Sequence, residues 1–249
     1  MDARYNAPQS TCSQKVRYTM AEKGLPFVEH KLKLFKNEQL RPEYLKLNPN
    51  GVVPTLVHDG RPIVDSSVIM EYLDDMHPES SLTPRDAEQR ARMRAWTRFF
   101  EEVPTVAVRF PSYNAAFARH FKEMNEEDFQ ALAASKPLRD KFLGEMDKNT
   151  GFSVARMKEA EQSIRKTVAR METSLATNPY LLGEQLTLAD ICVLPLQIRM
   201  DDLGYDFLWT EYPGVIAWLE RMKSRPSYAT AFYDGALLSQ QYPGIREAH

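Results

Sequence analysis

The sequence has few of the residues from which several kinds of site are built. Its two cysteines, Cys12 and Cys192, are too far apart for a disulfide framework or a metal-binding spacing, and a reducing compartment suits them best. The five histidines are scattered singly, so no metal site is expected. A formal net charge of −2 provides no basic surface for nucleic acid or for an anionic membrane.

Long apolar stretches are also missing. No run approaches the roughly 20 apolar residues that a membrane-spanning helix needs. The first residues contain no apolar core of a signal peptide. We therefore expect a cytoplasmic protein that binds neither a membrane nor nucleic acid.

The composition is that of a globular chain with room for one or two domains: 249 residues, of which 43% are hydrophobic and 27% are charged. Strand and helix patterns alternate in the first third. A short polar strand is expected around residues 3–6, a period-two strand over 28–34, and a hairpin that turns at Asp59-Gly60. With the helical patterns between them, the order βαβαββα is complete by residue 77.

A polar, proline-bearing stretch over residues 77–84 indicates a linker. Beyond it only helical patterns are convincing, and the one over 188–196 is apolar enough to be central and buried. We therefore predict an α/β domain at residues 1–79 and an all-α domain at residues 86–249.

The junction between the first strand and the first helix, residues 8–24, is the most informative stretch. Pro8 ends the strand, and Ser10 is a good N-cap. A helix start presents free N–H groups and a positive dipole end, which stabilise anions and thiolates in particular. Ser10 and Cys12 are therefore candidates for handling a thiol, although a capped helix with a small buried cysteine explains the same residues.

Four stretches, in order and at matching spacing, resemble those of the glutathione transferase superfamily, in particular its bacterial and zeta-like members. They are residues 10–17 (STCSQKVR), 47–56 (LNPNGVVPTL), 64–73 (VDSSVIMEYL) and 182–190 (LGEQLTLAD). The resemblance covers nearly the whole chain. It implies a thioredoxin-like first domain, an all-helical second domain, and glutathione as cosubstrate.

The resemblance also implies which residues hold glutathione. Pro54 is similar to the cis-proline of the thioredoxin-like fold, which turns the Val53 backbone so that it can pair with an extended peptide. At the next helix start, Ser66 would take the α-carboxylate of the γ-glutamyl group and Asp65 its ammonium, while both also cap the helix. The full implied set is Gln39, Val52, Val53, Pro54, Asp65 and Ser66.

Two residues compete for the role of thiol activation. Ser10 matches the serine of zeta- and theta-like relatives, whose hydroxyl donates a hydrogen bond to the glutathione thiolate. Cys12 matches the cysteine of beta-like transferases and reductive dehalogenases, which can form a mixed disulfide with glutathione. We favour Ser10, because conjugation and ether cleavage need no enzyme disulfide.

The acceptor pocket is expected in the helical half. Phe110, Tyr113, Phe117 and Phe121 recur at near-helical spacing after a proline break, and such a stripe suits either a pocket or a core. The polar segment at residues 122–152 resembles an insertion of bacterial glutathione-dependent β-aryl etherases, and a solvated loop with no role in the site explains it equally well.

The resemblance implies a glutathione transferase that directs the thiolate at a small hydrophobic electrophile, in particular an aromatic one, by conjugation or by thiolytic β-aryl ether cleavage. A reductive dehalogenase or a maleylacetoacetate-type isomerase is the alternative, and a non-catalytic binding or scaffold protein of the same fold is the competing class. A homodimer is also implied. Its expected contacts are the helix over 66–76 and the arginine row Arg90, Arg94 and Arg98, although such a row also suits a solvated face.

Overall fold

The computed structural model describes residues 3–247, so the outermost residues of the two predicted domains, 1–2 and 248–249, lie outside the described part. The first part holds a four-stranded mixed sheet in the order β2-β1-β3-β4, with β1 parallel to β2 and antiparallel to β3. The strands are β1 (Ala3–Asn6), β2 (Val28–Lys31), β3 (Thr55–His58) and β4 (Arg61–Val64), and the helices among them are α1 (Thr11–Glu22), α2 (Pro42–Leu45) and α3 (Ser66–Met76). The predicted order βαβαββα is confirmed.

The hairpin between β3 and β4 turns where it was predicted. Asp59 and Gly60 both have positive φ, 48° and 75°, as a two-residue turn between right-twisted strands requires. The second strand is shorter than predicted: β2 ends at Lys31 and a 3₁₀ turn follows at Leu34–Lys36. Its partner β1 ends at Asn6, which is paired with Lys31, so no strand remains against which β2 could continue.

The polar residues of β1 are buried, not exposed. The Arg4 and Asn6 side chains are inaccessible to solvent. An Arg4 Nη2 donates to Glu29 Oε1 at 2.7 Å, and its guanidinium lies over the Phe27 ring at 3.7 Å. Arg17 of α1 donates to Asn6 Oδ1 at 3.1 Å. A polar network therefore replaces the apolar packing expected beneath this strand.

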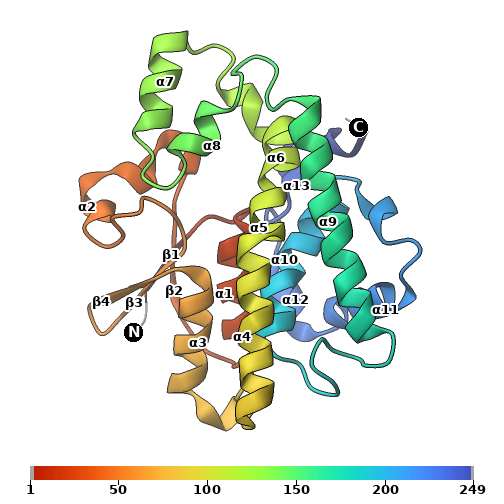
Figure 1. The fold of residues 1–249 in the computed structure, drawn as a ribbon. Coiled ribbons are helices and arrows are strands. Elements are labelled where there is room, and N and C mark those ends of the chain that lie inside the picture. The colour runs from red at the N-terminus through yellow and green to blue at the C-terminus, as the bar shows by residue number, and fades with distance from the viewer. Residues whose placement is uncertain (1–2, 248–249) are drawn as a thin grey trace.

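The second part is helical throughout the described residues. Its helices are α4 (Ala87–Glu102), α5 (Pro104–Ala107), α6 (Arg109–Ser112), α7 (Glu126–Ala134), α8 (Asp140–Gly144), α9 (Val154–Leu175), α10 (Leu188–Asp202), α11 (Pro213–Lys223), α12 (Pro226–Ala231) and α13 (Leu238–Gln241). A π-helical turn lies at Tyr113–Phe117, and 3₁₀ turns lie at Ala118–His120, Asp206–Leu208 and Ile245–Glu247. Two further 3₁₀ turns, at Glu38–Leu40 and Pro78–Ser80, belong to the first part. Figure 1 shows this part to the right of the sheet, with α7 and α8 above α2.

The helix predicted over 188–196 is central, as expected, and extends six residues further, to Asp202. Nearly all its residues are buried, because it packs against α1 on one side and α4 on another. Its start is fixed by Asp190, whose carboxylate accepts hydrogen bonds from Thr187 and from Trp218 Nε1. Among the described residues, no helix is long and apolar enough to cross a membrane.

Candidate active site

Ser10 is the N-cap of α1. Its Oγ accepts a hydrogen bond from the Ser13 backbone N–H at 3.2 Å, and its backbone is extended, as the cap position requires. Ser10 and Cys12 are both partly exposed, whereas Ser13 is buried and accepts from the Ala7 N–H at 3.3 Å. The two thiol-handling candidates therefore both lie at the start of a helix, where the Ser13 N–H is capped by Ser10 and the first backbone N–H groups have no acceptor within the helix.

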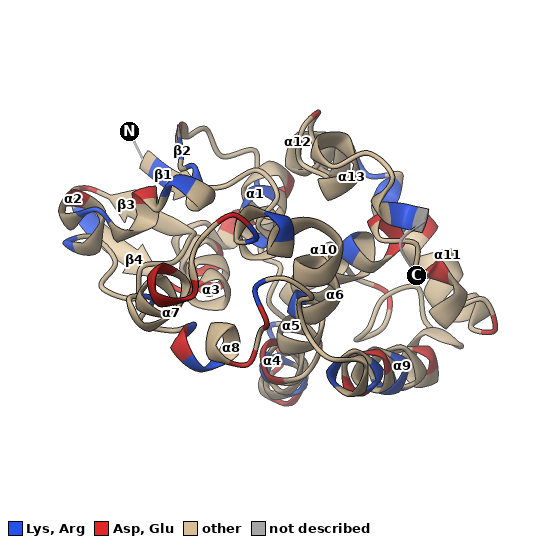
Figure 2. Ribbon diagram, turned by 90° about the horizontal axis from the view of Figure 1, so that it is seen from above, with Lys and Arg blue, Asp and Glu red and all other residues tan. Residues whose placement is uncertain are grey.

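Cationic side chains surround this turn. Lys15 is fully buried and donates to Glu101 Oε1 at 2.6 Å. Burial alone would lower the pKa of Lys15, but negative charge on Cys192, Glu101 and Cys12 raises it overall. Burial lowers the pKa of Arg199 to about 10, although negative charge on Asp202 and Cys12 acts to raise it. In the view from above, basic residues lie on α1 and α10 in the middle of the molecule (Figure 2).

The predicted glutathione-binding loop precedes β3. The Val53-Pro54 peptide bond is cis, as the sequence indicated, and both residues are buried. The loop is held from beneath, since Tyr44 Oη and Asn48 Nδ2 donate to the Val52 carbonyl at 2.6 and 2.9 Å. Within residues 3–247 the Val53 backbone N–H and C=O form no hydrogen bond, so they are open to an extended ligand.

Asp65 and Ser66 form the start of α3. Asp65 has a φ of 73°, a conformation that costs a non-glycine residue free energy and that clusters at functional sites. Its Oδ1 accepts from the N–H groups of Ser67 and Val68 at 2.9 and 3.2 Å. Asp65 is exposed, and Ser66 is buried at the end of the helix. The capping function is therefore present, and the Asp65 Oδ2 atom has no hydrogen-bond partner among the described residues.

Gln39 is buried, and within the described chain its amide oxygen has no hydrogen-bond partner. A buried unpaired acceptor is costly, so it indicates a site that a donor completes. The insertion reaches this neighbourhood: Lys136 Nζ donates to Asn37 Oδ1 at 3.1 Å. Pro137 lies 3.5 Å from the position that a Cβ at Gly51 would take.

The predicted aromatic stripe divides between core and pocket. Phe121 is buried against Phe129 of α7, with ring centroids 5.5 Å apart, so it belongs to the core. Tyr113 and Phe117 are partly exposed, with ring centroids 5.1 Å apart, and Phe117 lies at the same distance from Phe35. Phe117 therefore connects the helical part to Phe35 of the first part, and Tyr113 packs beside it.

Phe110 is largely buried but also contributes to a cavity. Its ring contacts those of Phe142 and Phe152 at centroid distances of 5.1 and 4.8 Å, and Tyr113 lies 4.9 Å from Phe142. Phe110 and Phe142 line a cavity of about 470 Å³. Since Phe142 and Phe152 belong to the segment 122–152, the insertion supplies part of this aromatic cluster and is more than a solvated loop.

Several residues near the site did not emerge from the sequence. Lys15 stands within the matched stretch 10–17, which could have drawn attention to it, whereas Arg199 carries no local signal. The two aromatic residues of the insertion lie in a polar segment without periodicity. Within residues 3–247, no group of three or more His, Cys, Asp or Glu side chains could hold a metal ion.

Comparison with known families decides the matter. The family model described as the glutathione S-transferase N-terminal domain matches residues 9–76, and that of the C-terminal domain matches residues 153–221. Protein LigF of Sphingobium sp. (strain NBRC 103272 / SYK-6) is 33% identical over 227 residues, 88% of each chain. The chain belongs to the glutathione S-transferase superfamily. It is a glutathione-dependent transferase with glutathione as cosubstrate, as the resemblance implied.

Other relatives belong to the same superfamily. Glutathione S-transferase 1 of Dianthus caryophyllus is 32% identical over 84% of this chain and 81% of its own. The tetrachloro-p-hydroquinone reductive dehalogenase of Sphingobium chlorophenolicum is 26% identical over 91% and 94%. The crystal structure of the β-etherase LigF from Sphingobium sp. strain SYK-6 superimposes with a TM-score of 0.81 at 31% identity, covering 93% of this chain and 98% of that one.

Proposed function

We propose that this transferase directs the glutathione thiolate at a hydrophobic aromatic electrophile, and that a β-aryl ether is the electrophile. Two facts support the choice. The relative with 33% identity and the superimposing structure at TM-score 0.81 are both LigF, and that structure is described as a β-etherase. The aromatic cluster of Phe110, Tyr113 and Phe142 gives an aryl group apolar surface on which to stack.

Glutathione would lie across the thioredoxin-like domain, residues 1–79. The α3 start, with Ser66, would take the γ-glutamyl carboxylate, and Asp65 the ammonium. The open Val53 backbone would pair with the peptide, and the unpaired Gln39 oxygen would accept one of its N–H groups. This arrangement places the sulfur at the start of α1, beside Ser10 and Cys12.

The reaction would then be a substitution at carbon. The Ser10 hydroxyl donates a hydrogen bond to the thiolate and stabilises it. The sulfur attacks the ether carbon, a C–S bond forms, the C–O bond breaks, and the electron pair leaves with the oxygen. The helical domain, residues 86–249, holds the aryl groups while this occurs.

The observation that carries the proposal is the position of the insertion. Phe142 and Phe152 complete an aromatic cluster with Phe110, while Lys136 of the same segment bonds to Asn37 beside the glutathione half. One segment therefore connects the predicted cosubstrate site with the apolar acceptor surface. A transferase acting on small polar electrophiles would need no such cover.

A substrate panel tests the proposal. The protein would be incubated with glutathione and, separately, a β-aryl ether, a chlorinated hydroquinone, maleylacetoacetate and a chloronitrobenzene, and the products separated by chromatography with mass detection. We expect release of a phenol together with a glutathione thioether from the ether. Dehalogenation or isomerisation without ether cleavage would contradict the choice of substrate.

Reductive dehalogenation is the second candidate, because Cys12 is partly exposed on the first turn of α1 among cationic side chains. A non-catalytic binding protein is the competing class. One relative is named for its localisation and not for a reaction: FtsZ-localized protein A of Caulobacter vibrioides is 25% identical over 98% of this chain. Calorimetry with reduced glutathione separates the classes. Absence of binding at millimolar glutathione would favour the scaffold.

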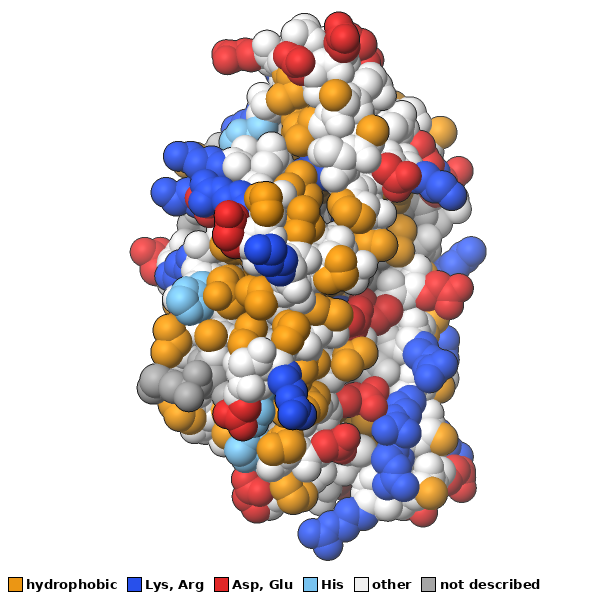
Figure 3. All heavy atoms as spheres, turned by 90° about the vertical axis from the view of Figure 1, so that its left-hand side faces the viewer, with side chains coloured by type: hydrophobic (Ala, Val, Ile, Leu, Met, Phe, Trp, Pro, Cys, Tyr) orange, Lys and Arg blue, Asp and Glu red, His pale blue; other side chains and the backbone are white. Residues whose placement is uncertain are grey.

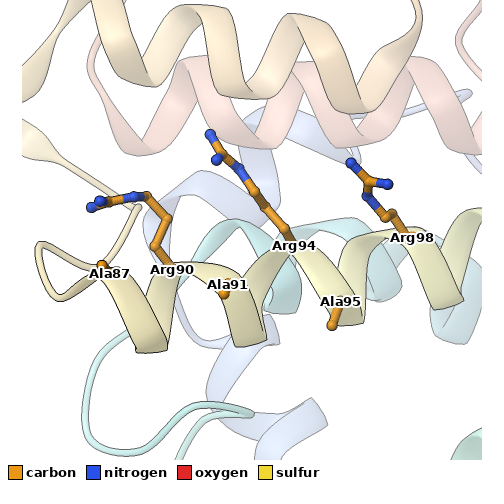
Figure 4. A pocket seen from close by; sticks show the side chains of 6 residues that line it. All are labelled: Ala87, Arg90, Ala91, Arg94, Ala95 and Arg98. Atoms are coloured by element: carbon orange, nitrogen blue, oxygen red, sulfur yellow. The ribbon is translucent and has the colours of Figure 1, made fainter.

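We also infer that two copies pair through α3 and α4. On α4, Arg90, Arg94 and Arg98 alternate with alanines along a shallow hollow of about 480 Å³, and the arginines extend to one side of the helix (Figure 4). On α3, Val68 and Met76 are 53% and 47% exposed. Figure 3, which views the molecule from the left-hand side of Figure 1, shows hydrophobic side chains gathered over the middle of that face.

Light scattering tests the pairing. A dimer would have twice the 28.7 kDa mass of one chain. Val68→Glu should shift the population toward the monomer, because it buries an unpaired charge in the contact. Val154→Glu is the matched control, since Val154 is 73% exposed on a different helix. A wild-type protein of one-chain mass, or equal behaviour of the two variants, would contradict this inference.

A further inference from the structure

Lys136 is a half-buried lysine of the insertion that no carboxylate neutralises. It lies in the turn between α7 and α8, two helices that stand above α2 in Figure 1. Its Nζ donates to Asn37 Oδ1 at 3.1 Å, and within residues 3–247 it forms no ion pair. Burial lowers the pKa of Lys136, and no negative charge opposes that effect. Ammonium groups withdrawn from water are normally paired, so this lysine is able to take an anionic partner.

The first-domain side of this contact contains two unusual polar residues. Asn37 has a φ of 53°, in the left-handed region that costs a non-glycine residue free energy and that clusters at functional sites. Gln39 is only 6% exposed, and its amide oxygen has no hydrogen-bond partner in the described chain. The bond to Asn37 therefore holds the Lys136 ammonium two residues along the chain from a buried acceptor that lacks a donor.

The insertion also meets the loop that is expected to pair with glutathione. A Cβ at Gly51 would lie 3.5 Å from Pro137 Cδ. Gly51 stands two residues before Val53, whose backbone N–H and C=O form no hydrogen bond among the described residues. Pro137 directly follows Lys136. The turn that carries Lys136 therefore packs at the Gly51 end of the loop, beside the open backbone groups.

The proposed placement of glutathione determines where its third residue lies. With the γ-glutamyl carboxylate at Ser66 and the cysteinyl backbone at Val53, the glycine extends from Val53 away from Ser66. The cysteinyl N–H faces Val53, which leaves the glycyl N–H for the Gln39 oxygen. In a glycine residue the carboxylate carbon lies about 2.5 Å from the amide nitrogen. A glycyl N–H at Gln39 thus brings the carboxylate to the side of the first domain that Lys136 covers.

We propose that Lys136 binds the glycyl carboxylate of glutathione, so that the insertion completes the cosubstrate site from the helical half. The inference rests on the proposed function, through the placement of glutathione, and not on the choice of electrophile. An ammonium has three donors, so Lys136 can keep its bond to Asn37 while it pairs with the carboxylate. Lys136 lies outside the stretches that the family models match, 9–76 and 153–221, so the family pattern does not supply this contact.

The contact would give the insertion a part in recognising glutathione as well as the acceptor. Phe142 of the same segment meets the Phe110 ring at a centroid distance of 5.1 Å. The glycyl carboxylate is remote from the sulfur, so its pairing is the same in the ground state and in the transition state. Lys136→Met should therefore raise KM for glutathione and leave kcat unchanged.

Calorimetry with two ligands tests the contact without turnover. One ligand is glutathione, and the other is its amide, in which a carboxamide of nearly the same shape replaces the glycyl carboxylate. We expect the wild-type protein to bind glutathione roughly tenfold more tightly than the amide. In Lys136→Met the affinity for glutathione should fall by about the same factor and that for the amide should hardly change, so the preference disappears. Lys136→Arg, which keeps the charge, should retain part of it.

Lys141→Met is the matched control, because Lys141 is an exposed lysine on α8 of the same insertion. It should keep the full preference for glutathione over the amide. If Lys136→Met weakened both ligands by one factor, Lys136 would have only a structural role and the contact would be overturned. A preference that Lys136→Met retains in full would assign the carboxylate to another residue and would also overturn it.

The two proposals fail in different ways. A preference that depends on Lys136, in a protein that cleaves no ether, would contradict the proposed reaction and leave the carboxylate contact standing. Ether cleavage by a protein that binds glutathione and its amide equally well would overturn the contact and leave the reaction standing. Absence of binding of both ligands would overturn both proposals.

Discussion

Replacing Ser10 with alanine is the sharpest perturbation of this site. The Ser10 Oγ accepts a hydrogen bond from the Ser13 N–H at 3.2 Å. A hydroxyl carries one proton and two acceptor lone pairs. The contact with the helix occupies a lone pair and leaves the proton, so Ser10 can cap α1 and donate to a glutathione sulfur at the same time.

The magnitude of each effect can be worked out separately. A hydrogen bond to a charged group contributes about 1.5–3 kcal/mol, which corresponds to a rise of roughly 1–2 in the pKa of bound glutathione when the bond is lost. At neutral pH the thiolate fraction, and with it kcat/KM, should then fall about tenfold or more. Loss of the N-cap should lower the free energy of unfolding by about 1 kcal/mol, which leaves the protein folded.

The assay compares Ser10→Ala with Cys12→Ala on one active substrate. The pKa of bound glutathione would be followed by the ultraviolet absorbance of the thiolate, and folding checked by urea denaturation. We expect Cys12→Ala to change neither the pKa nor kcat/KM appreciably. A fully active Ser10→Ala beside an inactive Cys12→Ala would refute the reasoning, because it would show a mixed disulfide on Cys12 to be the working intermediate.

Three further predictions concern the scaffold of the site. Asp190→Ala should lower the free energy of unfolding in urea by about 3–5 kcal/mol, since its buried carboxylate accepts four hydrogen bonds at 2.9–3.0 Å; a loss below about 1 kcal/mol would contradict this. Burial alone would raise the pKa of Asp74, but Lys23 at 2.8 Å and other donors hold it below 3.8. The resulting contribution to the free energy of unfolding is present above pH 3.8 and is lost as the pH falls through the lower pKa that Asp74 has in the folded protein. Asp74→Asn should therefore make the free energy of unfolding, measured by denaturation, depend less steeply on pH in the acid range. An unchanged dependence would contradict this prediction. Gly151→Ala should raise KM for the aromatic substrate without altering glutathione affinity, because a Cβ there would meet Asn114 Oδ1 at 2.3 Å; equal changes in both would contradict a local effect.

Local signals made much of the thioredoxin-like part predictable. The Asp59-Gly60 turn and the caps at Ser10 and Asp65 each depend on a few neighbouring residues, and all are found where they were expected. The helix start at Thr187 is of the same kind, with its capping box to the acid three residues on. The backbone conformation at turns and helix caps is determined by residues within a few positions, so it can be predicted from the sequence alone. The cis Val53-Pro54 bond, by contrast, was implied by the family resemblance.

The first strand shows where local reasoning fails. The sequence predicted a short polar strand here, yet its polar residues Arg4 and Asn6 are buried. Their partners come from elsewhere: Glu29 from β2 and Arg17 from α1. A pattern of alternating residues gives the faces of a strand but cannot tell whether an ion pair or an apolar contact covers one of them.

The contacts of the insertion, residues 122–152, could not be predicted from the sequence pattern either. Phe142 and Phe152 stand in a polar stretch without a helical period, so nothing local indicated that they would meet Phe110. The contact depends on Asn114, which donates to the Phe152 carbonyl at 3.1 Å and accepts from its N–H at 2.7 Å. A single side chain, 38 residues away along the chain, therefore fixes the end of the segment.

The loop that carries Ser10 is itself positioned by the helical half. Gln9 donates through Nε2 to the Gly235 carbonyl at 2.5 Å and accepts at its own carbonyl from Arg199, while Arg17 donates to the Pro8 carbonyl at 2.7 Å and to the Ala231 carbonyl at 2.8 Å. The carbonyls of the two residues before Ser10 are thus tied to distant parts of the chain: that of Gln9 directly to Arg199, 190 positions away, and that of Pro8 through Arg17 to Ala231. The position of Ser10 follows from contacts between the two domains, so a change confined to the C-terminal segment is able to move the hydroxyl that we propose as the thiol activator.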